Sequence, residues 1–172
     1  MKATRLGLAL LVGAALALGC GEPSPTAVSS AAAPRADLVS WLHVGGLVGC
    51  SPLPYDSVTE TIGPAGGTIT VGPHTLTIPP GALDQQVTIT AVVPSDTVNL
   101  IRFEPQGLRF EQPVRLTMSY ANCGLVNRLL PGHIAYTTDD LQILELIPGI
   151  DLLFSQQVEG PIHHFSNYAV AW

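Results

Sequence analysis

His163, His164 and Ser166 are the side chains whose types and spacing come closest to a reactive site in this chain. An imidazole can ligate a metal ion or take a proton, and a serine hydroxyl can act as a nucleophile. Adjacent residues of a strand point to opposite faces, so His163 and His164 cannot easily hold one ion together. The sequence also lacks the Gly-x-Ser-x-Gly, His-x-x-x-His and Cys-x-x-Cys patterns. We therefore expect neither a metal centre nor a conventional hydrolase.

Three other features suggest chemistry but lack the neighbours that the chemistry requires. Gly63–Thr68 (GPAGGT) has no lysine or following helix for a phosphate loop, so its glycines indicate a tight hairpin. Asp139 and Asp140 lack further oxygen ligands for calcium and are expected to cap a hairpin turn. Trp41 and Trp172 are the only tryptophans, which gives little support to a sugar platform. No cofactor is predicted, and carbohydrate binding is the weakest alternative function.

The N-terminus has the three-part layout of a secretory signal. Lys2 and Arg5 precede the apolar run Leu6–Leu18, which is too short to span a bilayer permanently. Cys20 follows a small residue, as in a bacterial lipobox, where the thiol is acylated and becomes the mature N-terminus. The residues before it match that pattern imperfectly and also suit ordinary signal cleavage, which would give a soluble secreted form. We expect a signal peptide over residues 1–19 and a lipid on Cys20.

The cysteine count agrees with the lipid interpretation. The chain has three cysteines, and an odd number in a secreted protein requires an explanation. If Cys20 carries lipid, Cys50 and Cys123 remain as an even pair in an oxidising compartment. We expect a disulfide between them, and two buried free thiols are the alternative.

The mature chain would be strongly acidic. Without residues 1–19 it keeps five arginines, no lysine and thirteen acidic residues, so its net charge is 5 minus 13, or −8. No basic patch is available to neutralise phosphates, which argues against nucleic-acid binding. Docking on an anionic lipid surface is disfavoured for the same reason. Membrane attachment is therefore expected through the N-terminal lipid, whose several acyl chains anchor stably.

Composition divides the rest of the chain into three parts. Residues 20–37 are rich in proline, serine and alanine and are expected to form a lipid-anchored flexible linker. Residues 38–56 form an apolar lead-in segment that we expect to lie against the folded domain, pinned by Cys50. Residues 57–172 alternate polar and apolar side chains, most clearly in Val87–Val93 and Val114–Tyr120, with turn signals about every ten residues. This pattern predicts an all-β fold, an antiparallel β-sandwich.

Four segments of this part, in their order and spacing, resemble the ZU5 domain. They are Gly63–Thr68, Ile78–Leu83 (IPPGAL), Pro105–Tyr120 (PQGLRFEQPVRLTMSY) and His164–Tyr168 (HFSNY). The resemblance covers about residues 58–172 and implies a β-sandwich interaction module whose partners differ from protein to protein. The second ZU5 copy, the UPA region and the death domain found in animal relatives are missing, so their roles do not transfer.

The resemblance also implies one possible reaction. In some ZU5-containing proteins a His-Phe-Ser tripeptide at this place is where the chain cuts itself. Transferred by motif, Ser166 would be the nucleophile, His164 the activating base, and Phe165–Ser166 the bond that breaks. The alternative is that Phe165, Tyr168 and Val170 pack the last strand while His164 and Ser166 form local hydrogen bonds. We expect the His-Phe-Ser motif to lie at the beginning of that last strand.

Together these features predict a noncatalytic lipoprotein of a bacterial cell envelope, in the outer membrane rather than the inner. Its role is expected to be protein binding or structural, with an envelope protein of unknown identity as partner. Self-cleavage at Phe165–Ser166 is the alternative from a different class. Neither nucleic acid nor a small-molecule cofactor is expected.

Overall fold

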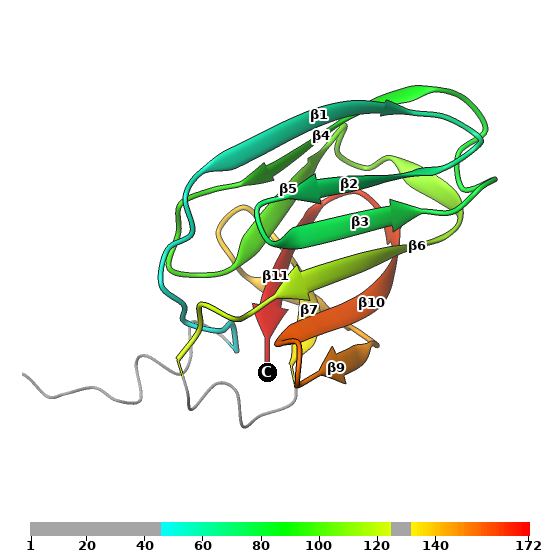
Figure 1. Ribbon diagram of the computed structural model, residues 1–172. Coiled ribbons are helices and arrows are strands. Elements are labelled where there is room, and N and C mark those ends of the chain that lie inside the picture. Colours follow the sequence, from blue (N-terminus) through cyan, green and yellow to red (C-terminus); the bar gives the residue numbers. More distant parts are fainter. Residues whose placement is uncertain (1–45, 125–131) are drawn as a thin grey trace, which may run out of the picture. The chain divides into compact units, whose positions relative to one another are not determined.

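A computed structural model describes residues 46–124 and 132–172, which form an all-β structure (Figure 1). Eleven strands occur in these ranges: β1 Asp56–Ile62, β2 Gly67–Val71, β3 His74–Ile78, β4 Val87–Val93, β5 Leu100–Glu104, β6 Arg109–Ser119, β7 His133–Thr137, β8 Ile143–Ile147, β9 Ile150–Leu152, β10 Gln157–His164 and β11 Asn167–Ala171. Within the same ranges no helix is long and apolar enough to cross a membrane. The predicted signal peptide, Cys20, the linker 20–37 and residues 38–45 lie outside the described residues.

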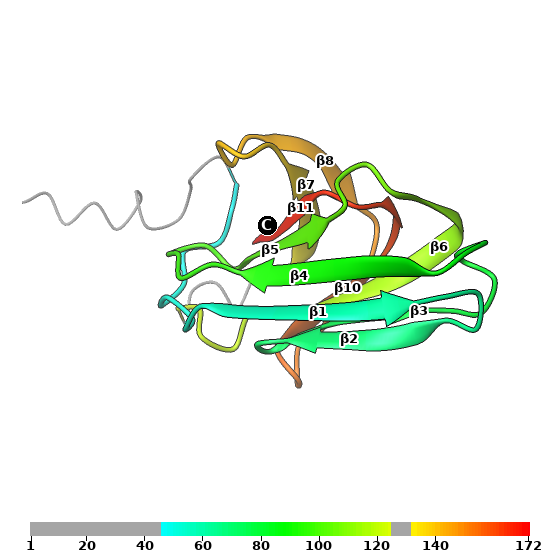
Figure 2. The same ribbon diagram turned by 90° about the horizontal axis from the view of Figure 1, so that it is seen from above.

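The strands form two antiparallel sheets. One has the order β1-β4-β5-β11-β7-β8 and the other β2-β3-β6-β10-β9. Viewed from above, β1 and β4 lie over β2 and β3 as separate layers (Figure 2). This arrangement confirms the predicted antiparallel β-sandwich.

The predicted hairpin at the double glycine is wrong. β1 pairs with β4 and β2 pairs with β3, so the turn Gly63–Gly66 carries the chain from one sheet to the other. Gly66 has a φ of 74°, and a Cβ there would lie 2.3 Å from the carbonyl oxygen of Ile78. A glycine is therefore required. The tight hairpin is the next one, where Gly72 and Pro73 join β2 to β3.

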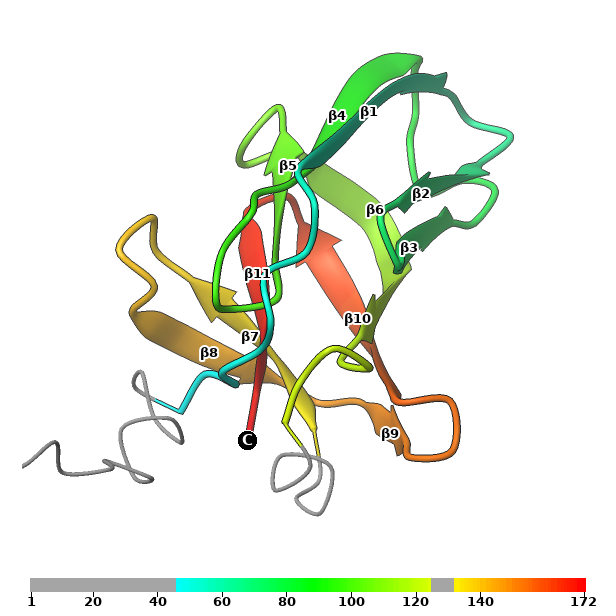
Figure 3. The ribbon, with the colours of Figure 1, turned by 60° about the vertical axis from the view of Figure 1, so that its left-hand side comes forward.

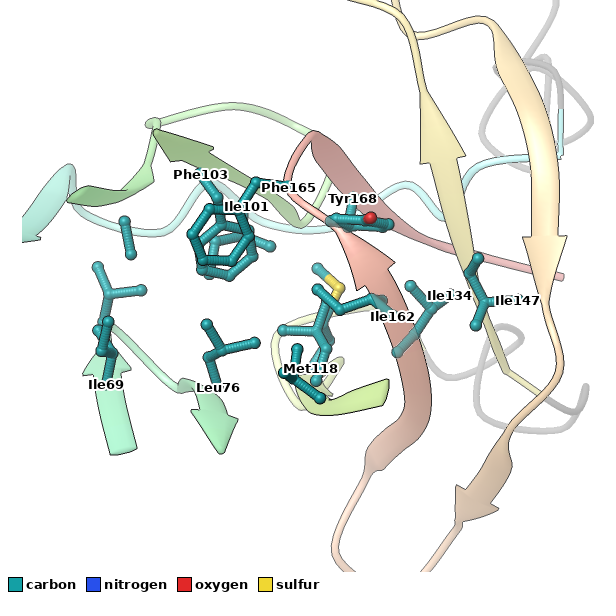
Figure 4. Close-up of a cluster of buried hydrophobic side chains, with 14 of the residues drawn as sticks. Ile69, Leu76, Ile101, Phe103, Met118, Ile134, Ile147, Ile162, Phe165 and Tyr168 are labelled. Carbon is teal, nitrogen blue, oxygen red and sulfur yellow. The ribbon is translucent and has the colours of Figure 1, made fainter. Parts of the chain in front are cut away.

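Alternation along the strands produces the core. Val114, Leu116, Met118 and Tyr120 are each at most 1% exposed. They face the buried side chains of the other sheet, and Figure 4 shows residues of both sheets meeting in one cluster. The Phe103 and Phe165 rings stack with their centroids 4.8 Å apart. Aromatic pairs of this kind contribute about 0.5–1.5 kcal/mol beyond the area that they bury.

The described part of the lead-in segment lies against the domain, as predicted. Leu47 and Val48 are buried, and the Val48 amide donates to the Val170 carbonyl at 2.9 Å. Leu47 packs with small residues on the outer face of the six-stranded sheet, whereas Val48 enters the main core. The sandwich therefore includes chain from before the predicted domain boundary.

The predicted disulfide between Cys50 and Cys123 is present. It joins the lead-in to the chain that follows β6, and both cysteines are buried.

His74 is a buried titratable side chain at the start of β3. Its Nδ1 accepts a hydrogen bond from the Ser119 amide at 3.1 Å, while its Nε2 has no hydrogen-bond partner among the described residues. The charged form loses its hydration in this position, so burial lowers the pKa of His74 from 6.5 to about 4. The imidazole is therefore neutral in the folded protein at pH 7.

Replacing both Cys50 and Cys123 by serine should lower the free energy of unfolding by up to about 4 kcal/mol. The reason is that the bond closes a loop with a sequence separation of 73 in the unfolded chain. Urea unfolding measures the loss. Dithiothreitol should destabilise the natural protein and leave the double variant unchanged. Equal unfolding midpoints for the natural protein and the double variant without reductant would contradict the expectation.

Acid should destabilise the fold through His74. The unfolded chain takes up a proton near pH 6.5 and the folded chain only near pH 4, so stability is complete above pH 6.5 and falls between these values. The loss is about 3 kcal/mol by pH 4. In His74→Asn, whose Oδ1 can still accept from the Ser119 amide, unfolding experiments from pH 7 to pH 4 should show a flatter decline. His163→Asn changes an exposed histidine and is the matched control; a parallel decline in His74→Asn would contradict the assignment.

Candidate functional site

The His164-Phe165-Ser166 motif lies in the turn between β10 and β11, not at the beginning of the last strand. His164 ends β10 in the five-stranded sheet, and Asn167 begins β11 in the six-stranded sheet. The turn therefore crosses between the two layers. Phe165 is 1% exposed and fills the core, whereas His164 and Ser166 are partly exposed.

The backbone of this turn pairs with the turn between β5 and β6. The Phe165 amide donates to the Leu108 carbonyl at 2.8 Å, and the Gly107 amide donates to the Phe165 carbonyl at 3.0 Å. The Phe103 amide donates to the Ser166 carbonyl at 3.2 Å. The structure thus brings together two motifs that were singled out separately in the sequence. Gly107, with a φ of 76°, was recognised only as a turn residue.

One backbone donor, and one imidazole nitrogen whose role depends on the tautomer, lie at the carbonyl oxygen of Phe165. Besides the Gly107 amide, the His164 Nδ1 lies 3.4 Å from this oxygen. The His164 ring packs edge-on against Tyr136, with ring centroids 5.0 Å apart. When Nδ1 carries the proton, these two groups form a donor pair, which is the arrangement that stabilises an oxyanion when a nucleophile adds to the carbon.

The remaining parts of a self-cleaving site are less complete. The hydroxyl of Ser166 makes no hydrogen bond to His164 or to any other residue that the structure describes. The Phe165–Ser166 peptide is trans, and neither residue has a positive φ. Phe165, Tyr168 and Val170 pack in the core as the packing interpretation predicts, and His164 bonds locally.

Tyr168 supports the turn from the following strand. Its hydroxyl donates to the His164 carbonyl at 2.6 Å. Burial raises the pKa of Tyr168, and the nearby Tyr136 and Glu145 raise it further, so the phenol stays protonated and remains a donor.

A polar hollow of about 550 Å³ opens beside the turn. Its lining residues are Gln106, Gly107, Arg109, Tyr136, His164, Phe165 and Ser166. The sequence did not indicate Gln106 and Arg109 as site residues, because the turn between β5 and β6 and the start of β6 are distant in the chain from the His164 motif.

A second, more apolar groove of about 580 Å³ crosses the outer face of the five-stranded sheet. Four prolines and one ion pair contribute to its walls. Its lining residues are Thr77, Pro79, Pro113, Val114, Arg115, Pro148, Gly149, Ile150, Glu159, Gly160 and Pro161. The Arg115 Nε lies 3.1 Å from a Glu159 carboxylate oxygen. This is the one ion pair within the described ranges.

Exposed apolar side chains are concentrated in one stretch of the chain, and one of them, Ile150, lines this groove. Of the seven large apolar residues that are exposed in the described parts of the chain, six belong to β8, β9 and the turn after β9: Leu144, Leu146, Ile150, Leu152, Leu153 and Phe154. We call these six residues the β8–β9 surface. The seventh, Tyr55, precedes β1. Figure 3 shows that β8 and β9 lie at the margins of the ribbon.

Metal ligands do not cluster. No group of three histidine, cysteine, aspartate or glutamate side chains that could hold an ion occurs in residues 46–124 and 132–172. Asp139 instead accepts a hydrogen bond from the Asn167 amide group at 2.8 Å, and it lies in the predicted hairpin turn, between β7 and β8.

No protein-family model matches this chain, and no curated protein matches it. The resemblance to ZU5 domains therefore stays a prediction from the four motifs.

Proposed function

We propose that this protein is a noncatalytic, ZU5-like module of a bacterial cell envelope that binds another envelope protein through the β8–β9 surface. In this proposal the signal peptide exports the chain, acylated Cys20 anchors it to the outer membrane, and the linker 20–37 holds the sandwich away from the lipid.

The observation that carries the proposal is the concentration of exposed apolar side chains in Leu144–Phe154. Phe154 has a relative exposure of 108%, which means that the domain covers none of its side chain. Soluble proteins seldom gather large apolar side chains in one exposed place unless it contacts something else. Aromatic and aliphatic anchors of this kind provide most of the binding free energy in protein interfaces.

Position in the sheets supports the same conclusion. β8 ends the six-stranded sheet and β9 ends the five-stranded sheet, so no further described strand pairs with either outer edge. Proteins usually protect such edges with lysine, proline or short strands. β9 is short, but β8 presents Leu144 and Leu146 at its edge.

Photo-cross-linking in the native envelope tests this function. A p-benzoylphenylalanine residue in place of Phe154 should form a defined protein adduct, because the ring lies at the partner interface. The same residue in place of Tyr55, which is 67% exposed elsewhere, is the matched control and should form little. Equal adducts from both positions, or none from position 154, would overturn the proposal.

Self-cleavage at Phe165–Ser166 is the second candidate, because the Gly107 amide donates to the Phe165 carbonyl oxygen and the His164 Nδ1 lies 3.4 Å from the same oxygen. The Ser166 Oγ would attack the Phe165 carbonyl carbon and pass its proton, through His164, to the departing Ser166 nitrogen. The C–N bond would break and an ester would form, with the Gly107 amide holding the oxyanion. Water would then hydrolyse the ester to a Phe165 carboxylate and a free Ser166 hydroxyl and amine.

An intact-mass measurement on denatured mature protein decides between the two candidates. The binding proposal predicts the full-length mass. Self-cleavage predicts loss of Ser166–Trp172 in the natural protein and full length in Ser166→Ala. Ser155→Ala, which changes an exposed serine in the β9–β10 turn, is the control.

A further inference from the structure

The β8–β9 surface carries negative charge that restricts its partner. Each edge strand places one acid between two exposed apolar residues: Leu144-Glu145-Leu146 on β8 and Ile150-Asp151-Leu152 on β9. Residues 129–172 contain five acids (Asp139, Asp140, Glu145, Asp151 and Glu159) and no lysine or arginine. The surface is therefore both apolar and acidic.

Within residues 46–124 and 132–172, neither Glu145 nor Asp151 belongs to an ion pair. Glu145 is exposed and belongs to no ion pair in the described residues, whereas Arg115 already neutralises Glu159. Asp151 accepts hydrogen bonds only from neutral donors, the Tyr120 hydroxyl at 2.6 Å and the Gly132 amide at 2.7 Å. These bonds hold the Asp151 carboxylate in place, so Glu145 is the exposed charge that a partner at β8 would balance.

The charge disfavours two occupants of this surface. A second copy packed edge to edge would bring Glu145 and its equivalent together, and like charges placed opposite one another on paired strands are destabilising. An anionic bilayer would be repelled by the same acids. A partner with complementary charge meets no such penalty.

We infer that the partner presents a cationic apolar segment in which aliphatic residues alternate with lysine or arginine. This inference rests on the proposed function. At the edge of β8 the aliphatic side chains would contact Leu144 and Leu146, while a cation would balance Glu145. An extended segment suits this open edge, because the outward amide and carbonyl groups of β8 can pair with its backbone. Glu145 selects the partner by repelling segments with an acid at the facing position.

Two synthetic peptides provide the first test on the full mature protein. Acetyl-Thr-Val-Lys-Val-Lys-Val-Thr-amide is expected to shift the backbone amide resonances of β8, and the peptide with glutamate in place of lysine is not. Glu145→Lys should weaken binding of the lysine peptide about tenfold, because like charges now face each other. Glu60→Lys, the same change on an exposed residue of β1, should leave binding unchanged.

The salt dependence separates specific pairing from general attraction to an acidic protein. At about 1 M salt, where the Debye length is about 3 Å, the preference for the lysine peptide should shrink, while the apolar contribution remains. Leu146→Ser should weaken binding at both salt concentrations. Equal binding of both peptides, or equal losses in Glu145→Lys and Glu60→Lys, would overturn the inference.

Repeating the cross-linking from position 154 in the Glu145→Lys background distinguishes the two proposals. Loss of the adduct there, but not in Glu60→Lys, supports the cationic partner. An adduct that forms equally in Glu145→Lys overturns the cationic partner and leaves the binding function intact. No adduct in the natural background overturns the binding function itself.

Discussion

The pairing of β11 between β5 and β7 is the interaction on which the rest of the structure depends. All five residues of this strand are buried. Tyr168 and Val170 enter the main core, while Ala169 and Ala171 lie on the outer face of the sheet beneath Leu47. A strand covered on both faces must satisfy its backbone groups through its neighbours, since water cannot reach them. The short strand β11 therefore holds β5, β7 and the lead-in segment in place.

This central position explains why the Phe165 turn is so firmly placed. The turn delivers the chain from β10 into β11, and its amide and carbonyl groups pair with the turn that links β5 to β6. Two crossings between the sheets thus lie side by side and share hydrogen bonds. If the Phe165–Ser166 bond were cut, β11 would keep its hydrogen bonds to both neighbouring strands and its buried side chains, so the fragment would stay in the fold.

Prediction from sequence succeeded where one side of a strand is buried and the other is not. Val87–Val93 and Val114–Tyr120 alternate because of that asymmetry, and the bond between Cys50 and Cys123 was expected on the premise that Cys20 carries lipid. The Gly63–Gly67 turn was assigned to a hairpin because glycines indicate positive φ but not which sheet the next strand joins. The contact of Gly107 with Phe165 joins residues far apart in the chain, and local spacing carries no signal for it.

The β8–β9 surface was missed for a related reason. Ile143-Leu144-Glu145-Leu146-Ile147 has the composition of a half-buried strand, and only the order of strands in the sheet shows that it lies at an edge. The sequence therefore contained the residues of the surface but not their exposure. The sequence likewise shows Glu145 but not that it lacks an ion pair within the described residues.

The disulfide also determines how a mechanical load would pass through the domain. If the chain is anchored through Cys20 as we propose, a pull would enter the described structure at Gly46 and reach Cys50, where the covalent bond to Cys123 offers a direct route to the following chain. A partner held on β8 or β9 would take up the force there. Strands β1 to β6 lie within the loop that the two cysteines close. Tension between membrane and partner would therefore bypass more than half of the strands, which could stay folded while the rest of the domain carries the strain.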